Sequence, residues 1–385
     1  CALFGLPASG RAQVYAALCR QLDKPLCIVT PGEAEATRFA ADLNTLGIPA
    51  AVFPARDYVL RPIEGTAREY EYRRLAVLGE LVGGRLRAVA VPAEALTQFT
   101  TPKEDFCANT RTLHAGDTLL RDDLLAALFG AGYTRRAQVD GPGQFSVRGD
   151  IVDIFAPDQK MPVRMEFWGD EIDTLHTFDL TTQRREDAID KFYLSPAREV
   201  LFGKPADAAE QLRAFLAKQR GKKKTAMADC MAADLDLLDG GAVPVNMDKY
   251  LAVRYPHPAT VLDYFDDPIL VAEEPASIRE ADRATAYRRG EELKSLILDG
   301  VLCAGLDNLY ADPSCLWSKT GHYRTICAEN FARSMPDQPL KDIINAPAHT
   351  LPAWNGEVAG LLEDLKPLCD AGYTVTLLAG TDRAA

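Results

Sequence analysis

The sequence lacks any long apolar run, which argues against a membrane-spanning helix. Its longest apolar stretches, such as 88–96, are interrupted by Pro92 and Glu94, whereas a bilayer needs roughly 20 apolar residues in succession. No secretory-signal pattern opens the chain, so we expect a cytoplasmic protein. An excess of basic charge is missing too, because 43 Lys and Arg stand against 55 Asp and Glu. The net charge of −12 provides no overall field to attract nucleic acid.

Paired metal-ligand motifs are also absent from the sequence. The nine cysteines are scattered, with no C-x-x-C pair and no Cys/His group at zinc-finger spacing. The five histidines come without an H-E-x-x-H motif or a Ser or Cys nucleophile elbow. An odd, dispersed set of cysteines fits reduced thiols in the cytosol. We therefore expect no structural disulfide, no metal site, no catalytic residue and no cofactor.

What is present is typical of a folded protein: 385 residues, 47% hydrophobic and 25% charged, enough for two or three domains. Residues 1–100 alternate continuous apolar strands with helices, which is typical of a parallel sheet covered on both faces. From about residue 116 the pattern changes to short period-two strands with one helix, and helix–strand alternation returns after 195. We predict divisions at 1–115, 116–195, 196–340 and 341–385.

The predicted fold class is α/β. A split, P-loop-like domain with a parallel sheet holds an inserted small α+β domain with an antiparallel sheet, and the start of a further αβ domain follows. In that last part we expect a linker at 340–351 and a strand at 373–379, whose following helix is cut off at 381–385. The chain therefore reads as a piece of something longer.

A glycine pair between the first strand and the first helix has P-loop spacing. Gly5 and Gly10 form G-x-x-x-x-G, the arrangement that cradles phosphates when Lys and Ser or Thr follow. Here Arg11 and Ala12 follow instead. Alanine cannot hold Mg²⁺, and arginine is a poor substitute for the compact lysine ammonium. We predict a relic, degenerate P-loop that has lost nucleotide hydrolysis, with residual phosphate binding as the alternative.

An acidic pair follows the strand predicted at 268–272. Glu273 and Glu274 stand where an ATPase places its metal-binding acids, but as Glu-Glu rather than Asp-Glu. We interpret them as surface acids at a strand end. The basic run at 222–224 is similarly interpreted as a solvent-exposed loop, with DNA contact as the less favoured alternative.

Period-two alternation assigns two faces to the segment 163–168. Val163, Met165 and Phe167 are apolar and should face the core. The alternate side chains project from the other face, and these are Arg164, Glu166 and Trp168.

The preceding strand follows the same rule. Phe145 and Val147 point inward, while Ser146 and Arg148 point outward. The alternation slips near 149–152, which predicts a bulge or bend there.

A sheet face that carries Arg148, Arg164 and an outward Trp168 has the composition of a protein–protein hot spot. In the alternative interpretation, Trp168 tucks under a loop and the arginines pair with Glu166 or Asp170. The pattern favours the interface.

The same segment carries a family resemblance. The strings R-G-D-I-V-D-I-F at 148–155 and F-W-G-D-E-I-D at 167–173, followed by T-Q-R at 182–184, closely resemble UvrB-type second domains. With the order of parts, they resemble the N-terminal UvrB-like region of bacterial transcription-repair coupling factors (Mfd). UvrB itself keeps an intact G-K-T P-loop and a long aromatic hairpin. Here the P-loop is degraded, and the segment after 53–58 reaches the next helix too quickly for such a hairpin.

The resemblance implies a non-catalytic adaptor that recruits UvrA to stalled RNA polymerase. The family's UvrA-contacting arginines fall on Arg148 and Arg164, and its aromatic residue falls on Trp168. The expected protein-binding face is completed by Glu166, Asp170 and Glu171.

The resemblance also implies further partners. A C-terminal domain of the same full-length polypeptide would cover this face as an autoinhibitor, and the parent would be an ATP-dependent DNA translocase. RNA polymerase and DNA would be met only through domains absent from this chain, and no membrane would be bound. Two alternatives stay open: a UvrB-type ATP-dependent DNA-damage-binding protein, and a purely autoinhibitory module.

Overall fold

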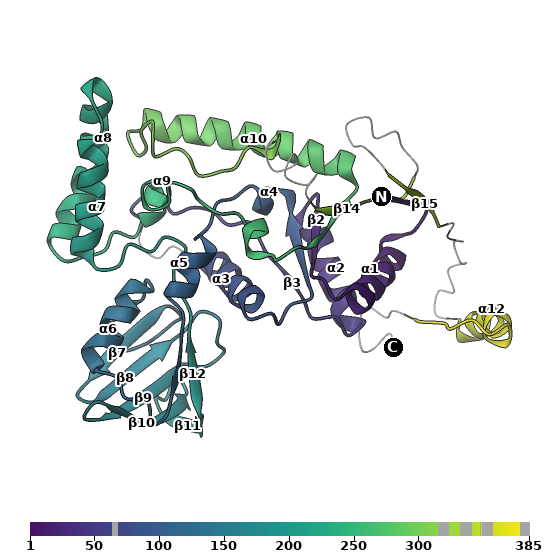
Figure 1. Cartoon of the computed structure of the whole chain (residues 1–385), viewed down its shortest axis with the longest axis horizontal. Coiled ribbons are helices and arrows are strands. Elements are labelled where there is room, and N and C mark those ends of the chain that lie inside the picture. The colour runs from purple at the N-terminus through teal and green to yellow at the C-terminus, as the bar shows by residue number, and fades with distance from the viewer. Residues whose placement is uncertain (64–67, 315–322, 332–340, 347, 349–356, 378–385) are drawn as a thin grey trace.

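The computed structural model describes residues 1–63, 68–314, 323–331, 341–346, 348 and 357–377. It contains a parallel sheet wrapped by helices, a smaller sheet at one end of the molecule, and a helical hairpin at another corner (Figure 1). This mixed architecture confirms the predicted fold class. No helix among the described residues is long and apolar enough to cross a membrane.

The parallel sheet has seven strands in the order β15-β1-β14-β13-β2-β4-β3. Its strands come from both sides of the inserted segment, so distant parts of the chain build one sheet. They are β1 (Ala2–Phe4), β2 (Leu26–Thr30), β3 (Ala50–Val52), β4 (Ala88–Pro92), β13 (Ile269–Glu273), β14 (Arg324–Glu329) and β15 (Ile343–Asn345). We expected a linker at 340–351, but residues 343–345 within it form β15 and pair with β1.

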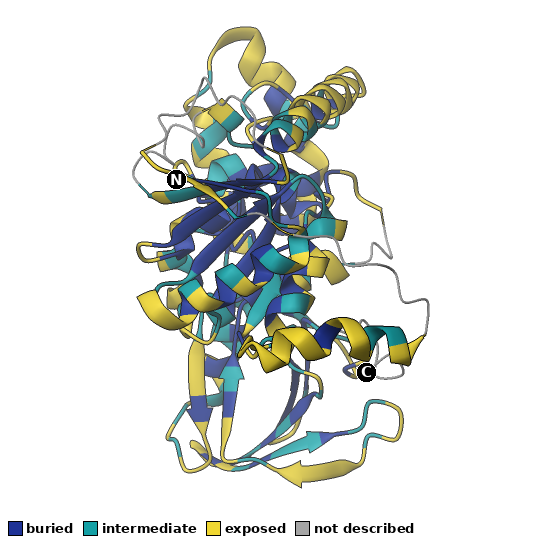
Figure 2. Ribbon diagram, turned by 90° about the vertical axis from the view of Figure 1, so that its right-hand side faces the viewer, coloured by how far each residue is buried: buried dark blue, intermediate teal, exposed yellow. Residues whose placement is uncertain are grey.

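Helices cover both faces of this sheet, which explains why its central strands are apolar throughout. On one face, α1 (Ala8–Leu22) and α2 (Glu33–Thr45) bury Tyr15 and Phe39. On the other face lie α3 (Glu69–Val82) and the start of α10 (Pro275–Leu298). Figure 2 shows the buried strands between these layers.

The smaller sheet has six strands in the order β11-β10-β9-β8-β7-β6. All neighbours are antiparallel except β6 and β7. The strands are β6 (Thr134–Arg135), β7 (Gln144–Arg148), β8 (Ile151–Phe155), β9 (Val163–Trp168), β10 (Glu171–Phe178) and β11 (Arg185–Ala188). The helix α6 (Arg121–Gly130) packs on its apolar face, where the rings of Phe129 and Phe145 lie 5.3 Å apart.

The chain enters and leaves this region through one short ribbon. The strand β5 (Arg111–His114) pairs antiparallel with β12 (Lys191–Leu194), so the two ends of the inserted segment lie side by side. The predicted domain divisions stay a prediction.

Two Gly-Asp turns close the hairpins of the small sheet. Arg148 pairs with Ile151 across Gly149, and Trp168 pairs with Glu171 across Gly169. Both glycines have positive φ, 60° and 63°, which a two-residue hairpin turn requires at its first central position. The predicted bend near 149–152 is therefore this hairpin turn, and no bulge interrupts the pairing of β7 with β8. Irregular register occurs in β10, between Ile172 and Thr174 against β9 and between His176 and Phe178 against β11.

The sequence interpretation missed the long helix α8 (Gly221–Asp239). After α7 (Pro205–Ala217), α8 runs back along it. The run 222–224 lies in the first turn of α8 rather than in a loop, because Met227, Met231 and Leu238 anchor the helix in a buried cluster. Those three lysines are exposed.

Several short elements complete the chain. They are α4 (Ala93–Leu96), α5 (Lys103–Ala108), η1 (Met247–Tyr250), α9 (Leu251–Arg254), η2 (Val261–Tyr264) and α12 (Val358–Asp370). The strand expected at 373–379 is absent from its described part, 373–377. The expected cut-off helix at 381–385 lies outside the described residues.

Candidate functional site

A buried carboxylate lies at the centre of the predicted protein-binding face. Asp153 stands in the middle strand β8, directly opposite Ser146 of β7 and Arg164 of β9. Its carboxylate accepts hydrogen bonds from Arg164 Nε at 2.7 Å and Nη2 at 2.9 Å, and from Arg148 Nη2. Asp153 is 1% exposed. One carboxylate therefore holds both predicted arginines.

Arg164 is covered more than the alternation predicts. Its Nη1 donates to the carbonyl of Gln183 at 3.2 Å, and its guanidinium lies 4.8 Å from the ring centre of Phe178. The hydrogen bonds to Asp153 raise its pKa. Only 11% of its side chain is exposed, against 48% for Arg148.

A small apolar cluster on the same face explains this cover. It consists of Val139, Phe155 and Phe178, with Leu180 packed against them. Ser146 lies on this face as predicted but is buried rather than exposed. The second face of the sheet is thus partly closed by its own loops.

Trp168 ends β9 and is 81% exposed. The alternative in which it tucks under a loop is therefore wrong. The other half of that alternative is wrong as well, since the arginines pair with Asp153 and not with Glu166 or Asp170.

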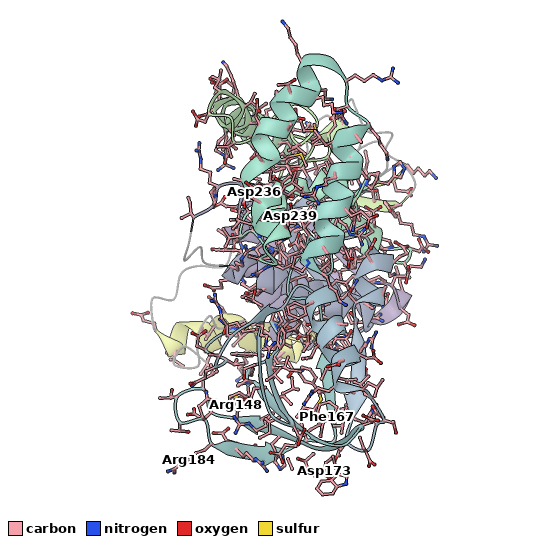
Figure 3. The ribbon with its side chains drawn as sticks, turned by 90° about the vertical axis from the view of Figure 1, so that its left-hand side faces the viewer. Arg148, Phe167, Asp173, Arg184, Asp236 and Asp239 are labelled. Atoms are coloured by element: carbon pink, nitrogen blue, oxygen red, sulfur yellow. The ribbon has the colours of Figure 1, made fainter. Side chains whose placement is uncertain are left out.

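Glu166 has partners of its own, an ion pair with Arg185 and a hydrogen bond from Thr174 Oγ1 at 3.3 Å. Asp170 and Glu171 are exposed beside the turn. Figure 3 shows Arg148 and Arg184 at this end of the molecule, away from the parallel sheet. That these residues bind a protein stays a prediction.

The loop that the sequence predicts to be a relic P-loop is closed by side chains of this chain. Arg11 is 3% exposed, and its Nη1 lies 2.9 Å from Glu273 Oε2 and 3.0 Å from Glu274 Oε1. The Tyr15 hydroxyl also donates to Glu273. Ala12 is fully buried in the same apolar layer, and Gly10 lies within α1.

The interpretation of both acids as surface residues is wrong for Glu273, which is 2% exposed. Glu274 keeps 34% of its side chain exposed. Burial raises the pKa of Glu273 to about 7, against the opposing effect of Arg11. Arg11 thus connects the loop to the strand end where a nucleotide-binding protein would place its metal ligands.

Gly5 is needed for a contact with the segment that follows β15. Its φ is 87°, and a Cβ there would lie 2.7 Å from the carbonyl oxygen of Ala346. The Ala346 amide donates to the carbonyl of Phe4 at 2.9 Å. The chain itself therefore packs against the first glycine of the loop.

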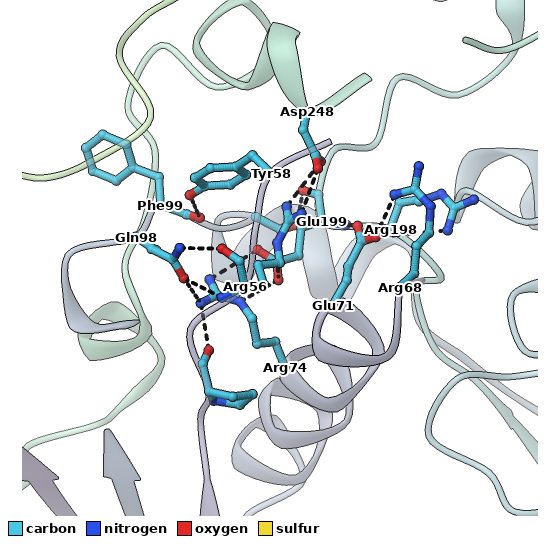
Figure 4. Close-up of polar contacts among 12 residues, drawn as sticks. Arg56, Tyr58, Arg68, Glu71, Arg74, Gln98, Phe99, Arg198, Glu199 and Asp248 are labelled. Carbon is cyan, nitrogen blue, oxygen red and sulfur yellow. Dashed lines mark hydrogen bonds and ion pairs between the residues drawn. The ribbon is translucent and has the colours of Figure 1, made fainter. Parts of the chain in front are cut away.

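A buried charge network between the two sheets escaped the sequence analysis (Figure 4). Arg74 Nε lies 2.6 Å from Glu199 Oε1, and Arg56 Nη1 lies 2.7 Å from Asp248 Oδ2. Burial opposes the ionisation of Glu71, yet three nearby arginines and the amide of Glu199 lower its pKa to about 2. These residues are up to 192 positions apart, so no local motif marks them. They join α3 and the segment after β3 to the segment after β12 and to η1.

No group of His, Cys, Asp or Glu within the described ranges could hold a metal ion.

Known proteins resemble this chain along almost its whole length. A family model described as the UvrB interaction domain matches residues 112–200. A transcription-repair-coupling factor of Bacillus subtilis (strain 168) is 24% identical over 98% of this chain and 33% of its own length. One from Staphylococcus aureus (strain MRSA252) is 25% identical over the same shares. One from Myxococcus xanthus is 35% identical over 51% of this chain and 17% of its own length. The chain spans about a third of the length of the first two relatives.

Proposed function

We propose that this chain is a non-catalytic docking module of the transcription-repair-coupling factor type, to whose members it is similar along almost its whole length, and that it recruits the excision repair protein UvrA. The observation that carries the proposal is the exposed Trp168 at the end of β9 together with the half-exposed Arg148 at the end of β7, both on the small sheet inside the segment matched by the UvrB interaction domain. Large exposed aromatic side chains next to arginine are the residues that most often dominate binding energy in protein interfaces. The proposal places the chain in the cytoplasm, where DNA repair takes place in bacteria.

Each element of the face has a distinct task in this proposal. Trp168 enters an apolar pocket of UvrA and loses its contact with water. Arg148, half exposed, donates charge-assisted hydrogen bonds to carboxylates of UvrA. Glu166, Asp170 and Glu171 form the polar rim around these anchors.

The relic P-loop supports a role without nucleotide hydrolysis. Arg11 is neutralised by Glu273 and Glu274, so it does not offer a free cation to a phosphate. Ala12 supplies no oxygen for Mg²⁺. We propose that ATP-driven translocation, RNA polymerase binding and DNA binding belong to other parts of a longer parent protein. In the same proposal, a C-terminal domain of the parent covers the docking face until the motor engages.

Calorimetric titration of purified UvrA into the chain tests the proposal. We expect binding that Trp168→Ala weakens at least tenfold, about 1.4 kcal/mol. The matched control is Tyr287→Ala on α10, since Tyr287 is also an exposed aromatic residue, at 76%, and the helix α10 lies away from the small sheet (Figure 1). Equal binding by both variants and the wild type would contradict the assigned face, and absent binding by the wild type would contradict recruitment.

A nucleotide titration separates this proposal from the UvrB-type alternative. We expect no binding of Mg-ATP to the chain at millimolar concentrations. Tight Mg-ATP binding that Arg11→Ala abolishes would favour an ATP-dependent damage-binding protein instead.

A further inference from the structure

Arg164 lies on the docking face but is mostly engaged within the chain. Asp153 takes its Nε and one Nη2 hydrogen, and the carbonyl of Gln183 takes an Nη1 hydrogen. Phe178 lies under the guanidinium. With 11% of its side chain exposed, Arg164 is placed to brace the face more than to contact a partner.

The bond to Gln183 connects this brace to the turn 179–184. Gln183 has φ 59°, a left-handed conformation that a residue other than glycine adopts only when its surroundings hold it there. Asp179 accepts a hydrogen bond from the Thr182 amide at 2.7 Å, and its own amide donates to the carbonyl of Arg184 at 3.0 Å. Hydrogen bonds therefore hold the turn at its two ends, Asp179 and Arg184, and at Gln183 between them.

Arg184 extends from this turn into solvent. It is exposed, and no ion pair of its side chain occurs among the residues that the structure describes. Its neighbour Arg185 is paired with Glu166. Figure 3 shows Arg148 and Arg184 at the same side of the small sheet. Arg148 is thus bonded directly to Asp153, and Arg184 directly follows Gln183, whose carbonyl accepts a hydrogen bond from Arg164.

We infer that Asp153 is a positioning residue of the docking face, and that through Arg164 it fixes Arg184 as a further contact for an acidic protein surface. The inference rests on the proposed function, since it assigns how that face is held and which additional residue it presents. Asp153 acts directly on Arg148 and, through Arg164 and the carbonyl of Gln183, on Arg184. The partner chemistry is a set of carboxylates spaced to meet Arg148 and Arg184 together.

A double-mutant cycle on UvrA binding tests this inference. We expect Arg184→Ala to weaken binding about fivefold in the wild-type background and to have little further effect once Asp153→Asn is present. Asp153→Asn keeps the shape but removes the charge, and alone it should weaken binding about tenfold. Non-additivity of this kind identifies two residues that act through one structure. A merely structural role of Asp153 would leave the effect of Arg184→Ala the same in both backgrounds.

Two further variants keep the test decisive. Arg164→Lys preserves the charge but cannot bond both Asp153 oxygens and Gln183 at once, so we expect it to remove the effect of Arg184→Ala as well. Arg111→Ala, at an exposed arginine of the separate ribbon formed by β5 and β12, is the control and should leave binding unchanged. Circular dichroism establishes that each variant is folded, and if Asp153→Asn is not, the Arg164→Lys cycle decides.

The outcomes separate the two proposals. Wild-type chain that fails to bind UvrA overturns the proposed function. Wild-type binding with an Arg184→Ala effect that persists unchanged in Asp153→Asn or Arg164→Lys, or with no Arg184→Ala effect at all, overturns the positioning role while recruitment stands.

Discussion

The proposed docking face and the loop predicted to be a relic P-loop are built from the same chemistry and differ in how far they expose their arginines. In both, a buried carboxylate holds an arginine from another strand or helix: Asp153 holds Arg148 and Arg164, and Glu273 holds Arg11. In the relic loop the side chain of Arg11 is 4% exposed, whereas Arg148 on the docking face keeps 48% of its side chain in solvent. The same kind of ion pair therefore buries the arginine in the loop, whereas on the small sheet it leaves about half of the arginine side chain in solvent.

This difference teaches that an arginine's burial, and not its pairing alone, decides whether it is available to a partner. A fully buried ion pair stabilises the fold only when its geometry is good. Removing one of its two partners leaves the other charge buried and unpaired. A half-exposed pair contributes little to stability but orients a guanidinium for another protein.

Removal of Arg11 should be the most damaging change. Arg11→Ala leaves the buried Glu273 without its cation, and we expect a loss of about 3–5 kcal/mol in the free energy of unfolding, measured by urea denaturation. Arg148→Ala, which leaves Asp153 still paired with Arg164, should lose less than about 1 kcal/mol. Equal losses for the two variants would contradict the contrast between the sites.

The pH dependence of stability should reveal Glu273. Its pKa in the folded chain is about 7, above the value of about 4.3 expected in the unfolded chain, so the folded state holds a proton that the unfolded state has released. The resulting stabilisation is complete below about pH 4 and is lost as the pH rises through 7. Relative to Glu273→Gln, the wild type should therefore lose about 1–3 kcal/mol between pH 5 and pH 8. Parallel stability profiles for the two proteins would show that Glu273 does not titrate in this range.

Removal of the Trp168 side chain should affect binding without affecting stability. The ring is 81% exposed, so Trp168→Ala leaves no cavity in the folded chain. It should change the free energy of unfolding by less than about 0.5 kcal/mol. The same variant should lose at least about 1.4 kcal/mol of UvrA binding. A variant that unfolds earlier than the wild type would indicate that Trp168 packs within the chain.

The lysines of α8 should have the smallest effect. Lys222, Lys223 and Lys224 lie in the first turn of the helix, where positive charge opposes the helix dipole. Replacing all three with Gln should stabilise the chain by a few tenths of a kcal/mol and leave UvrA binding within twofold. Loss of UvrA binding in this variant would place a second contact on α8.

Local periodicity predicted the parallel sheet, the two faces of 163–168 and the outward direction of Trp168. These features depend on neighbours in the sequence, because strand alternation fixes which side chains share a face. The same reasoning failed for Ser146, which lies on the predicted face but is buried there. Alternation assigns a face but does not say what covers it.

Long-range partners were beyond sequence reasoning. Glu273 is buried because Arg11 and Tyr15 meet it from more than 250 positions away. Asp153 lies in the segment 148–155, which carries the family resemblance. Its bond to Arg164 nevertheless depends on the register of β8 with β9, which the segment alone does not give. The helix α8 was missed because its first turn is basic and polar, while its anchoring residues pack against elements distant in the chain.

The most direct test of the account follows Trp168 itself during binding. The chain has three tryptophans, so labelling with 5-fluorotryptophan gives three ¹⁹F resonances, and Trp168→Phe identifies the one from Trp168. We expect that resonance to shift and broaden when UvrA is added, and to remain unchanged with Mg-ATP. Saturating UvrA binding that leaves the Trp168 resonance at its free position would contradict the docking face.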